Sequence, residues 1–140
     1  MASNTNSAFT LAERAGKTTV SSGSTWEPKI GYSRAVKKGN MIFVSGCVGI
    51  REDKTFAPDV AEQTARSLEI ITAALAALGA TPADVVMTRM YMTDISEWEK
   101  AAMAHGRIFG DIRPATVMVE VSSLIDDAAL IEIEATAVVG

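Results

Sequence analysis

The sequence predicts a single α+β domain, in which two helices pack on one face of a β-sheet. The chain has 140 residues and a hydrophobic content of 48%, which suits one core and is too short for two ordinary domains. Its periodic segments follow the order strand, strand, helix, strand, helix, strand, strand. Two helices of this length cover only one face of the sheet, so we expect oligomerisation to cover the apolar parts of the other face.

The N-terminal segment predicts a flexible tail followed by the folded domain. Residues 1–16 are rich in Ser, Asn, Thr and Ala and contain few apolar side chains, so we expect a flexible tail there and the domain over residues 17–140. Residues 17–21 are β-prone, and residues 22–28 are typical of a turn. We expect Trp26, within this turn, to cover an edge of the core.

Residues 31–49 predict a β-hairpin with its turn at residues 38–40 (KGN), because Gly and Asn tolerate the positive φ of tight turns. Its second strand, residues 41–45, is of the buried type and stops at Gly46. The backbone N–H groups of a Ser45-Gly46 pair could hold a small anionic or carbonyl group. A simple strand end or a bulge explains the same pair equally well.

Apolar residues at helical spacing predict two helices, over residues 59–78 and 96–109. Each begins with residues typical of a capping box and is followed by a glycine. The capping boxes pair Asp59 with Glu62 and Ser96 with Glu99. The second helix has an apolar stripe of Trp98, Ala102 and Phe109. His105 lies near this stripe, and we expect a partly buried structural histidine there rather than a catalytic one.

Residues 85–93 predict a strand that is covered on both sides, because its two faces are both largely apolar. One face carries Val86, Thr88, Met90 and Met92, and the other carries Met87, Arg89 and Tyr91. We expect one face to meet the helices and the other to meet another subunit.

The last thirty residues predict a second β-hairpin, formed by alternating strands over residues 115–121 and 129–139. In the second of these strands Glu132 and Glu134 share one face. On a solvated face they are ordinary solubilising charges. In a cleft, either carboxylate becomes a candidate general acid or base.

Composition argues against several classes of function. A net charge of −4 provides no long-range attraction to phosphate backbones or anionic lipid, so we expect no nucleic-acid partner. No apolar run is long enough to span a bilayer and no secretory signal is recognisable, so we expect a cytoplasmic protein without a membrane partner. Cys47 is the single cysteine and cannot form an internal disulfide. No metal-ligand spacing or nucleotide-binding motif is present, so the sequence predicts no metal and no cofactor.

Several segments taken together resemble the RidA (YjgF/YER057c/UK114) family, over about residues 28–139. They are GYSRAV at 31–36, MIFVSG at 41–46, the helix over 62–80, DVV at 84–86, PA at 114–115 and IEIEA at 131–135. The resemblance implies a chorismate-mutase-like α+β fold, with a mixed sheet and two helices packed on one face. It also implies a homotrimer with small-molecule clefts between subunits. Typical members hydrolyse reactive enamines and imines to ketoacids and ammonia.

One residue that this resemblance leads us to expect is missing. In deaminating members an Arg follows the Pro-Ala pair and clamps the substrate carboxylate with two hydrogen bonds. The equivalent residue in this chain is Thr116. A hydroxyl carries no charge, and a buried carboxylate that loses such a partner loses about 2–5 kcal/mol of recognition. This argues against the usual 2-iminoacid deaminase activity, although Arg113, Arg34 and Arg89 are alternative anion anchors.

The resemblance also assigns roles to individual residues. It makes Glu132 and Tyr32 the expected catalytic residues, with Glu132 positioning the attacking water. The expected ligand-binding residues are Ser45, Gly46, Cys47, Thr116, Met118 and Arg113. The pocket is less polar than in typical members, because Cys47 replaces a usual Gln, Met118 a small residue such as Cys, and Ala102 a usual Asn. We expect Cys47 to be a buried or pocket-lining thiol rather than a nucleophile.

Three functions follow. The first is a RidA-like hydrolase of an enamine or imine with altered substrate preference, in which Glu132 orients water while Tyr32 and the Ser45-Gly46 backbone hold the ligand. Glu134 is then a structural or surface charge. The second is a non-catalytic trimeric small-molecule binder, which the missing Arg favours. The third is RNA cleavage or inhibition of translation, suggested only by older family names such as L-PSP endoribonuclease, and the acidic balance argues against it.

Overall fold

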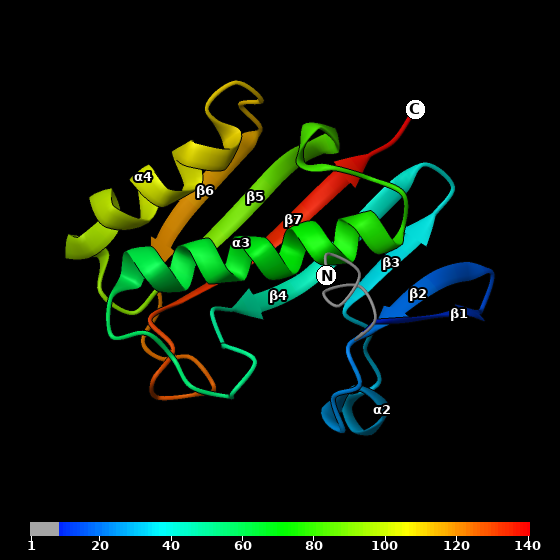
Figure 1. The fold of residues 1–140 in the computed structure, drawn as a ribbon, viewed down its shortest axis with the longest axis horizontal. Helices are drawn as coiled ribbons and strands as arrows, with labels where there is room; N and C mark the ends of the chain where they lie inside the picture. Colours follow the sequence, from blue (N-terminus) through cyan, green and yellow to red (C-terminus); the bar gives the residue numbers. More distant parts are fainter. Residues whose placement is uncertain (1–8) are drawn as a thin grey trace.

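The computed structural model describes residues 9–140, which form one seven-stranded sheet. Figure 1 shows the two long helices lying across the same face of this sheet. The strand order is β1-β2-β3-β4-β7-β5-β6, with β5 and β6 parallel and every other pair antiparallel. The predicted α+β fold, a mixed sheet with two helices on one face, is confirmed.

The elements, in chain order, are β1 (Thr10–Arg14), β2 (Lys17–Ser21), α2 (Trp26–Ile30), β3 (Ala35–Lys38), β4 (Met41–Val48), α3 (Val60–Ala77), η1 (Pro82–Asp84), β5 (Val85–Met92), η2 (Ile95–Glu97), α4 (Trp98–Phe109), β6 (Ala115–Glu120) and β7 (Ile131–Val138).

Within the predicted tail, residues 10–14 form strand β1. This strand pairs antiparallel with β2 along its whole length. The turn between them is made by Ala15 and Gly16, whose φ angles are 51° and 78°. Every residue of β1 is exposed, so no apolar alternation marks the strand in the sequence. Residues 1–8 of the predicted tail lie outside the described residues.

The predicted hairpin over residues 31–49 is confirmed by the antiparallel pair β3 and β4, and Gly39 in its turn has a φ of 60°. The expectation that Trp26 covers the core is wrong, because Trp26 is 59% exposed on the short helix α2. The buried residue of this helix is Glu27, whose carboxylate accepts hydrogen bonds from the Ser22 N–H at 3.0 Å and hydroxyl at 2.6 Å.

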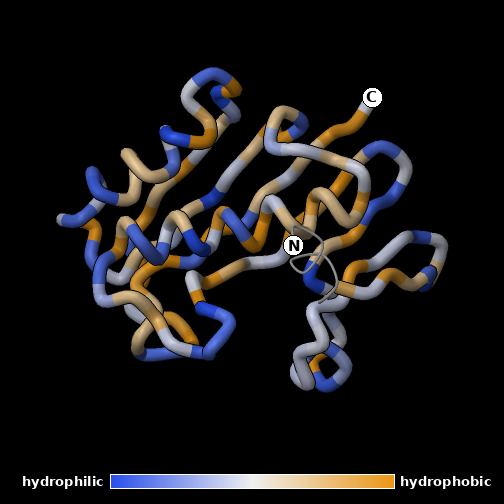
Figure 2. Tube along the Cα trace, in the orientation of Figure 1, coloured by the Kyte–Doolittle hydropathy of each residue, from blue (hydrophilic) through white to orange (hydrophobic). Residues whose placement is uncertain are grey.

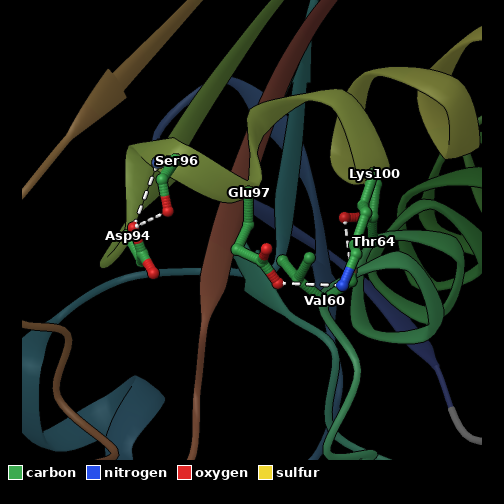
Figure 3. Close-up of polar contacts among 6 residues, drawn as sticks. All are labelled: Val60, Thr64, Asp94, Ser96, Glu97 and Lys100. Carbon is green, nitrogen blue, oxygen red and sulfur yellow. Dashed lines mark hydrogen bonds and ion pairs between the residues drawn. The ribbon is translucent and has the colours of Figure 1, made fainter.

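Both predicted helices are present, but they begin differently from the prediction. The Asp59 side chain makes no capping hydrogen bond at the start of α3. The chain before α4 forms the 3₁₀ helix η2, where Asp94 accepts hydrogen bonds from the Ser96 N–H at 3.0 Å and hydroxyl at 2.6 Å. Figure 3 shows these contacts, together with the ion pair between Lys100 and Glu97, near the first turn of α3. Asp94 therefore caps η2, whereas α4 itself begins without a side-chain cap.

The buried face of α4 also differs from the predicted apolar stripe. Trp98 is 51% exposed, and the buried residues of the helix are Ala101, Ala104 and Phe109. Alanine side chains are short, so they let α4 lie close to α3 and to the sheet. Small size, rather than hydrophobic bulk, marks the packed face of this helix.

The predicted C-terminal hairpin is wrong, although both of its strands exist. β7 pairs with β4 on one side and β5 on the other, whereas β6 pairs only with β5. Strand β5 therefore lies between the two strands of the predicted hairpin (Figure 1). The connection from β5 through α4 to β6 is a crossover between parallel strands, which places β6 beside β5 at the edge of the sheet.

The core lies between the helices and the central strands, and the opposite face of the sheet stays open. In Figure 2 apolar residues recur along the strands and along α3. Buried Ile42 and Val44 of β4 flank Phe43, which is 47% exposed on the other face. Val117 and Val119 of β6 are also exposed, at 42% and 39%. An apolar sheet face without a helix cover is thus present within the single chain.

Replacing Ile133 with alanine should destabilise the fold by about 2–5 kcal/mol, because this side chain is fully buried at the centre of the sheet. Ile125→Ala is the matched control, since Ile125 is fully exposed and should change stability little. Urea unfolding of both variants measures the difference. Equal midpoints for the two variants would contradict the described core.

Candidate functional site

Glu132 lies on the open face of the sheet, directly over Gly46. Its neighbours Ile131 and Ile133 are both fully buried, so the alternation of β7 directs Glu132 away from the helices. A Cβ atom placed on Gly46 would lie 2.0 Å from Glu132 Oε2, which is closer than real atoms approach. The missing side chain of Gly46 therefore makes room for the Glu132 carboxylate.

The predicted Ser45-Gly46 pair forms a β-bulge rather than a plain strand end. Three residue steps along β4 match two along β7, so β4 accommodates one extra residue. The pairs on either side of the bulge are Val44 with Ala135 and Cys47 with Ile133. A bulge bends its strand locally and re-aims the side chains and backbone groups around it.

Arg34 binds this bulge from the segment just before β3. Its Nη1 atom donates hydrogen bonds to the carbonyl oxygens of Ser45, at 3.1 Å, and Gly46, at 2.7 Å. Ser45 donates from its hydroxyl to the Ser33 carbonyl oxygen at 2.6 Å, and from its N–H to the Arg34 carbonyl oxygen at 2.9 Å. Both hydrogen-bond donors of Ser45 are thus engaged within the chain, so Ser45 shapes the bulge.

Cys47 and Tyr32 both lie next to Arg34. The Arg34 Nη1 atom is 2.9 Å from Cys47 Sγ, and the guanidinium carbon is 5.8 Å from the centroid of the Tyr32 ring. Cys47 is 3% exposed, and burial raises the pKa of its thiol, an effect that the charge of Arg34 opposes. A buried thiol with a raised pKa is a poor nucleophile.

The electrostatic state of Glu132 differs from that of Glu134. Burial raises the pKa of Glu132, Arg34 opposes this shift and the charge of Glu134 adds to it. Glu134 instead accepts a hydrogen bond from the Tyr91 hydroxyl, and this bond raises the pKa of Tyr91. Within residues 9–140 no side chain donates a hydrogen bond to Glu132. The Glu132 carboxylate is therefore the acidic group that remains available to a water molecule or a ligand.

These carboxylates line an open hollow of about 330 Å³. Its lining residues are Gly46, Tyr91, Val121, Ser123, Leu124, Glu132 and Glu134. The sequence did not single out Tyr91 or the loop after β6 as parts of a site. Alternation indicated the face on which Tyr91 lies, but its position opposite Glu132 depends on β5 pairing with β7.

The other predicted ligand-binding residues lie at the edge of the sheet, on its helix-covered side. Thr116 and Met118 of β6 pair with Thr88 and Met90 of β5, which are both buried beneath the helices. Thr88 Oγ1 lies 2.7 Å from Thr116 Oγ1 and 2.9 Å from His105 Nε2. Glu132 and Thr116 are therefore on opposite faces of the sheet, and one chain does not bring them together.

Arg113 is placed by the turn that follows α4. It has a φ of 56°, and its Nε atom donates a hydrogen bond to the Gly110 carbonyl oxygen at 3.1 Å. Its guanidinium is therefore engaged with the end of the helix. Of the alternative anion anchors, Arg113 binds this turn, Arg34 binds the bulge, and Arg89 lies on the open face opposite Glu134 in register.

Two other kinds of site find no support in the described part of the chain. Residues 9–140 contain no group of three or more His, Cys, Asp or Glu side chains arranged to hold a metal ion. None of the helices described is long and apolar enough to cross a membrane.

Comparison with known families gives a match over nearly all of the described chain. The family model described as Endoribonuclease L-PSP matches residues 22–139. A RutC family protein of Pyrococcus abyssi is 42% identical over 108 residues, which cover 76% of this chain and 84% of that protein. A RutC family protein of Saccharolobus solfataricus is 38% identical over 104 residues, covering 73% and 82% of the two chains.

Solved structures share both the fold and the sequence. The crystal structure of Rv2704 from Mycobacterium tuberculosis, a member of the YjgF/YER057c/UK114 family, is 49% identical with a TM-score of 0.82, covering 88% of this chain and 99% of that one. Escherichia coli TdcF with bound serine is 27% identical with a TM-score of 0.74, covering 78% and 88%.

Fold and site together define a small α+β protein with a carboxylate-lined hollow on the open face of its sheet. The chain belongs to the Endoribonuclease L-PSP family, the RidA or YjgF/YER057c/UK114 family that the sequence motifs indicated.

Glu132→Gln should raise the melting temperature at pH 7 and have a smaller effect near pH 3.5. Because the folded-state pKa of Glu132 is raised, the neutral carboxyl contributes stability that is present below the unfolded-state pKa and is lost as pH rises through the folded-state pKa. Glutamine resembles the neutral form at every pH. Thermal unfolding at both pH values checks this, with the exposed Glu69→Gln as control. An equal shift at both pH values would contradict the raised pKa.

Proposed function

We propose that this protein is a RidA-like homotrimer with small-molecule clefts between its subunits, and that the clefts hydrolyse an enamine or imine to a carbonyl compound and ammonia. The observation that carries this proposal is the Glu132 carboxylate, which lies over Gly46 in the hollow and has a raised pKa. A carboxyl whose pKa moves toward neutrality can both accept and return a proton.

The reaction needs a single proton-transfer group. Glu132 accepts a proton from water as the water oxygen attacks the carbon of the protonated imine, which gives a neutral carbinolamine. Glu132 returns this proton to the carbinolamine nitrogen, and the C–N bond then breaks to release ammonia. As the hydroxyl becomes the carbonyl group its proton passes to Glu132, which loses it to the departing ammonia and is again a carboxylate. Tyr32 and the Ser45-Gly46 bulge hold the ligand beside Glu132, with Cys47 behind the bulge. Tyr91 keeps Glu134 occupied, so the second carboxylate does not compete for the water.

The location of the cleft between subunits is supported by the separation of the site residues. Glu132 lies on the open face, whereas Thr116 and Met118 lie at the β6 edge on the helix-covered side. A second copy packed on the open face would cover Phe43, Val117 and Val119. In the proposed trimer the β6 edge of a neighbouring copy supplies Thr116 and Met118 to the cleft. E. coli TdcF, whose structure contains bound serine, has the same fold and shows that one relative holds a small ligand.

A non-catalytic small-molecule binder is the second candidate function. Two observations favour it: Thr116 is uncharged, and Arg34 and Arg113 are engaged in local hydrogen bonds. The β6 edge therefore has no arginine to clamp a carboxylate. The matching family bears an endoribonuclease name. The net charge of −4 does not favour the binding of RNA phosphates.

Glu132→Ala should lower ammonia release by about 10²- to 10⁴-fold, because it removes the group that activates water. The substrates are freshly generated 2-aminoacrylate and a carboxylate-free, N-unsubstituted imine made by oxidation of a simple primary amine, because only a C=N–H group releases ammonia. Spontaneous hydrolysis of each substrate is the baseline. Glu69→Ala, an exposed substitution on α3, is the control and should retain the wild-type rate. A wild-type rate equal to background on both substrates would leave the non-catalytic binder as the function. Catalysis that is unaffected in Glu132→Ala would refute the role of Glu132.

The assembled protein should have three times the mass of one chain, and Phe43→Glu should reduce it to monomers. A buried unpaired charge on the open face opposes association, because its desolvation is not compensated. Met103→Glu is the matched control, since Met103 is 66% exposed on α4 and lies on the helical side. Light scattering after size exclusion measures the masses. A monomeric wild type, or two variants that behave alike, would refute the trimer.

A further inference from the structure

Three polar side chains on the helix-covered side of the β6 edge have no part in the proposed reaction. Thr116 lies on β6, Thr88 on β5 and His105 on α4. The Thr88 Oγ1 atom is 2.7 Å from Thr116 Oγ1 and 2.9 Å from His105 Nε2. Thr88 is fully buried, whereas Thr116 is exposed. A chain of hydrogen bonds therefore leads from the interior to the edge of the sheet.

The hydrogens available link the donor direction along these hydrogen bonds to the tautomer of His105. When the Thr88 hydroxyl donates its only hydrogen to Thr116 Oγ1, it accepts one from His105. In this arrangement the Nε2 atom of His105 carries the ring hydrogen. Thr116 Oγ1 accepts the hydrogen from Thr88, which leaves its own hydroxyl hydrogen free to be donated at the exposed edge.

The surroundings of these hydrogen bonds are uncharged. His105 stacks against Phe109 with ring centroids 4.6 Å apart, and burial lowers the pKa of the imidazole, which keeps it neutral at neutral pH. Arg113 is bonded to the end of α4, and Arg89 pairs with Val117 on the opposite face of the sheet. No guanidinium is hydrogen-bonded to Thr116 within residues 9–140. The edge therefore offers one oriented hydrogen-bond donor without a positive charge.

We propose that His105 and Thr88 are positioning residues that fix Thr116 as a hydrogen-bond donor, so that the cleft selects imines or enamines anchored by a neutral carbonyl or amide oxygen rather than by a carboxylate. This inference rests on the proposed intersubunit cleft. A hydroxyl donor pairs fully with a neutral oxygen, whereas a desolvated carboxylate would keep its charge uncompensated. The side chain at position 116 thus changes the class of substrate rather than removing recognition.

The first test needs binding alone and uses the single histidine of the chain as its reporter. In ¹⁵N-histidine-labelled trimer above pH 7.5, we expect the ring hydrogen on Nε2. Isobutyramide should shift this resonance, and the isosteric isobutyrate should do so at concentrations roughly ten-fold higher or not at all. Thr88→Val keeps the shape of the buried side chain but removes the hydroxyl that links His105 to Thr116. The amide should therefore no longer shift the His105 signal.

Several outcomes of this test would overturn the proposal. They are a ring hydrogen on Nδ1, equal responses to the amide and the acid, no response to either probe, and an amide response that survives in Thr88→Val. Because no turnover is required, a protein that binds the amide in this way but hydrolyses no imine would refute only the proposed reaction.

The second test compares kcat/KM for an imine derived from an amino-acid amide with kcat/KM for the imine of the matching amino acid. We expect wild type to prefer the amide by roughly ten-fold or more, and Thr116→Ser to retain the preference because it keeps the hydroxyl. Thr116→Val and Thr88→Val should lose it, and Thr116→Arg should reverse it by supplying a carboxylate clamp. A preference unchanged in Thr88→Val would show that the hydrogen bonds through Thr88 do not set substrate specificity.

Discussion

The central position of β7 is the constraint on which the rest of the structure depends. This strand has β4 on one side and β5 on the other, and its Ile131 and Ile133 are fully buried beneath the helices. Hydrogen bonds on both sides hold its register, and a shift of one residue would bury both glutamates and expose both isoleucines. The same alternation that builds the core therefore presents Glu132 and Glu134 on the open face.

Strand β4 adjusts to this arrangement through its bulge. Gly46 has no side chain, which leaves space for the Glu132 carboxylate, and the extra residue in β4 is held by Arg34 through two backbone carbonyl oxygens. The core contact of β4, the position of the carboxylate and the engagement of Arg34 are thus parts of one local structure. Arg34, one of the predicted alternative anion anchors, instead maintains the shape of the bulge.

The two groups of candidate site residues are separated by the sheet itself. Glu132 and Tyr91 face the open side, while Thr116 and His105 lie on the helix-covered side at the β6 edge. In the homotrimer that we propose, a neighbouring copy would bring the two groups together in one cleft. The open sheet face, with exposed Phe43 and Val117, is where that neighbour would pack.

Much of the fold could be predicted from local patterns. Alternation located β5 and β7, helical spacing located α3 and α4, and the KGN turn located the β3–β4 hairpin. Strand β1 was missed because all of its residues are exposed, so solvent imposes no apolar pattern on it. The capping boxes were predicted from residue types alone, and these residues also serve in turns and at surfaces.

What the sequence by itself determined is the alternation of Glu132 with buried isoleucines, the uncharged Thr116 and the family motifs, because each depends only on residues close together in the chain. What only the tertiary structure decided is the order of the strands. Pairing between distant segments placed β5 between β6 and β7, set Tyr91 opposite Glu132 and joined His105 to Thr116 through Thr88. Strand pairing depends on packing and hydrogen bonding across the whole sheet, so the periodicity of short segments does not determine the order of the strands.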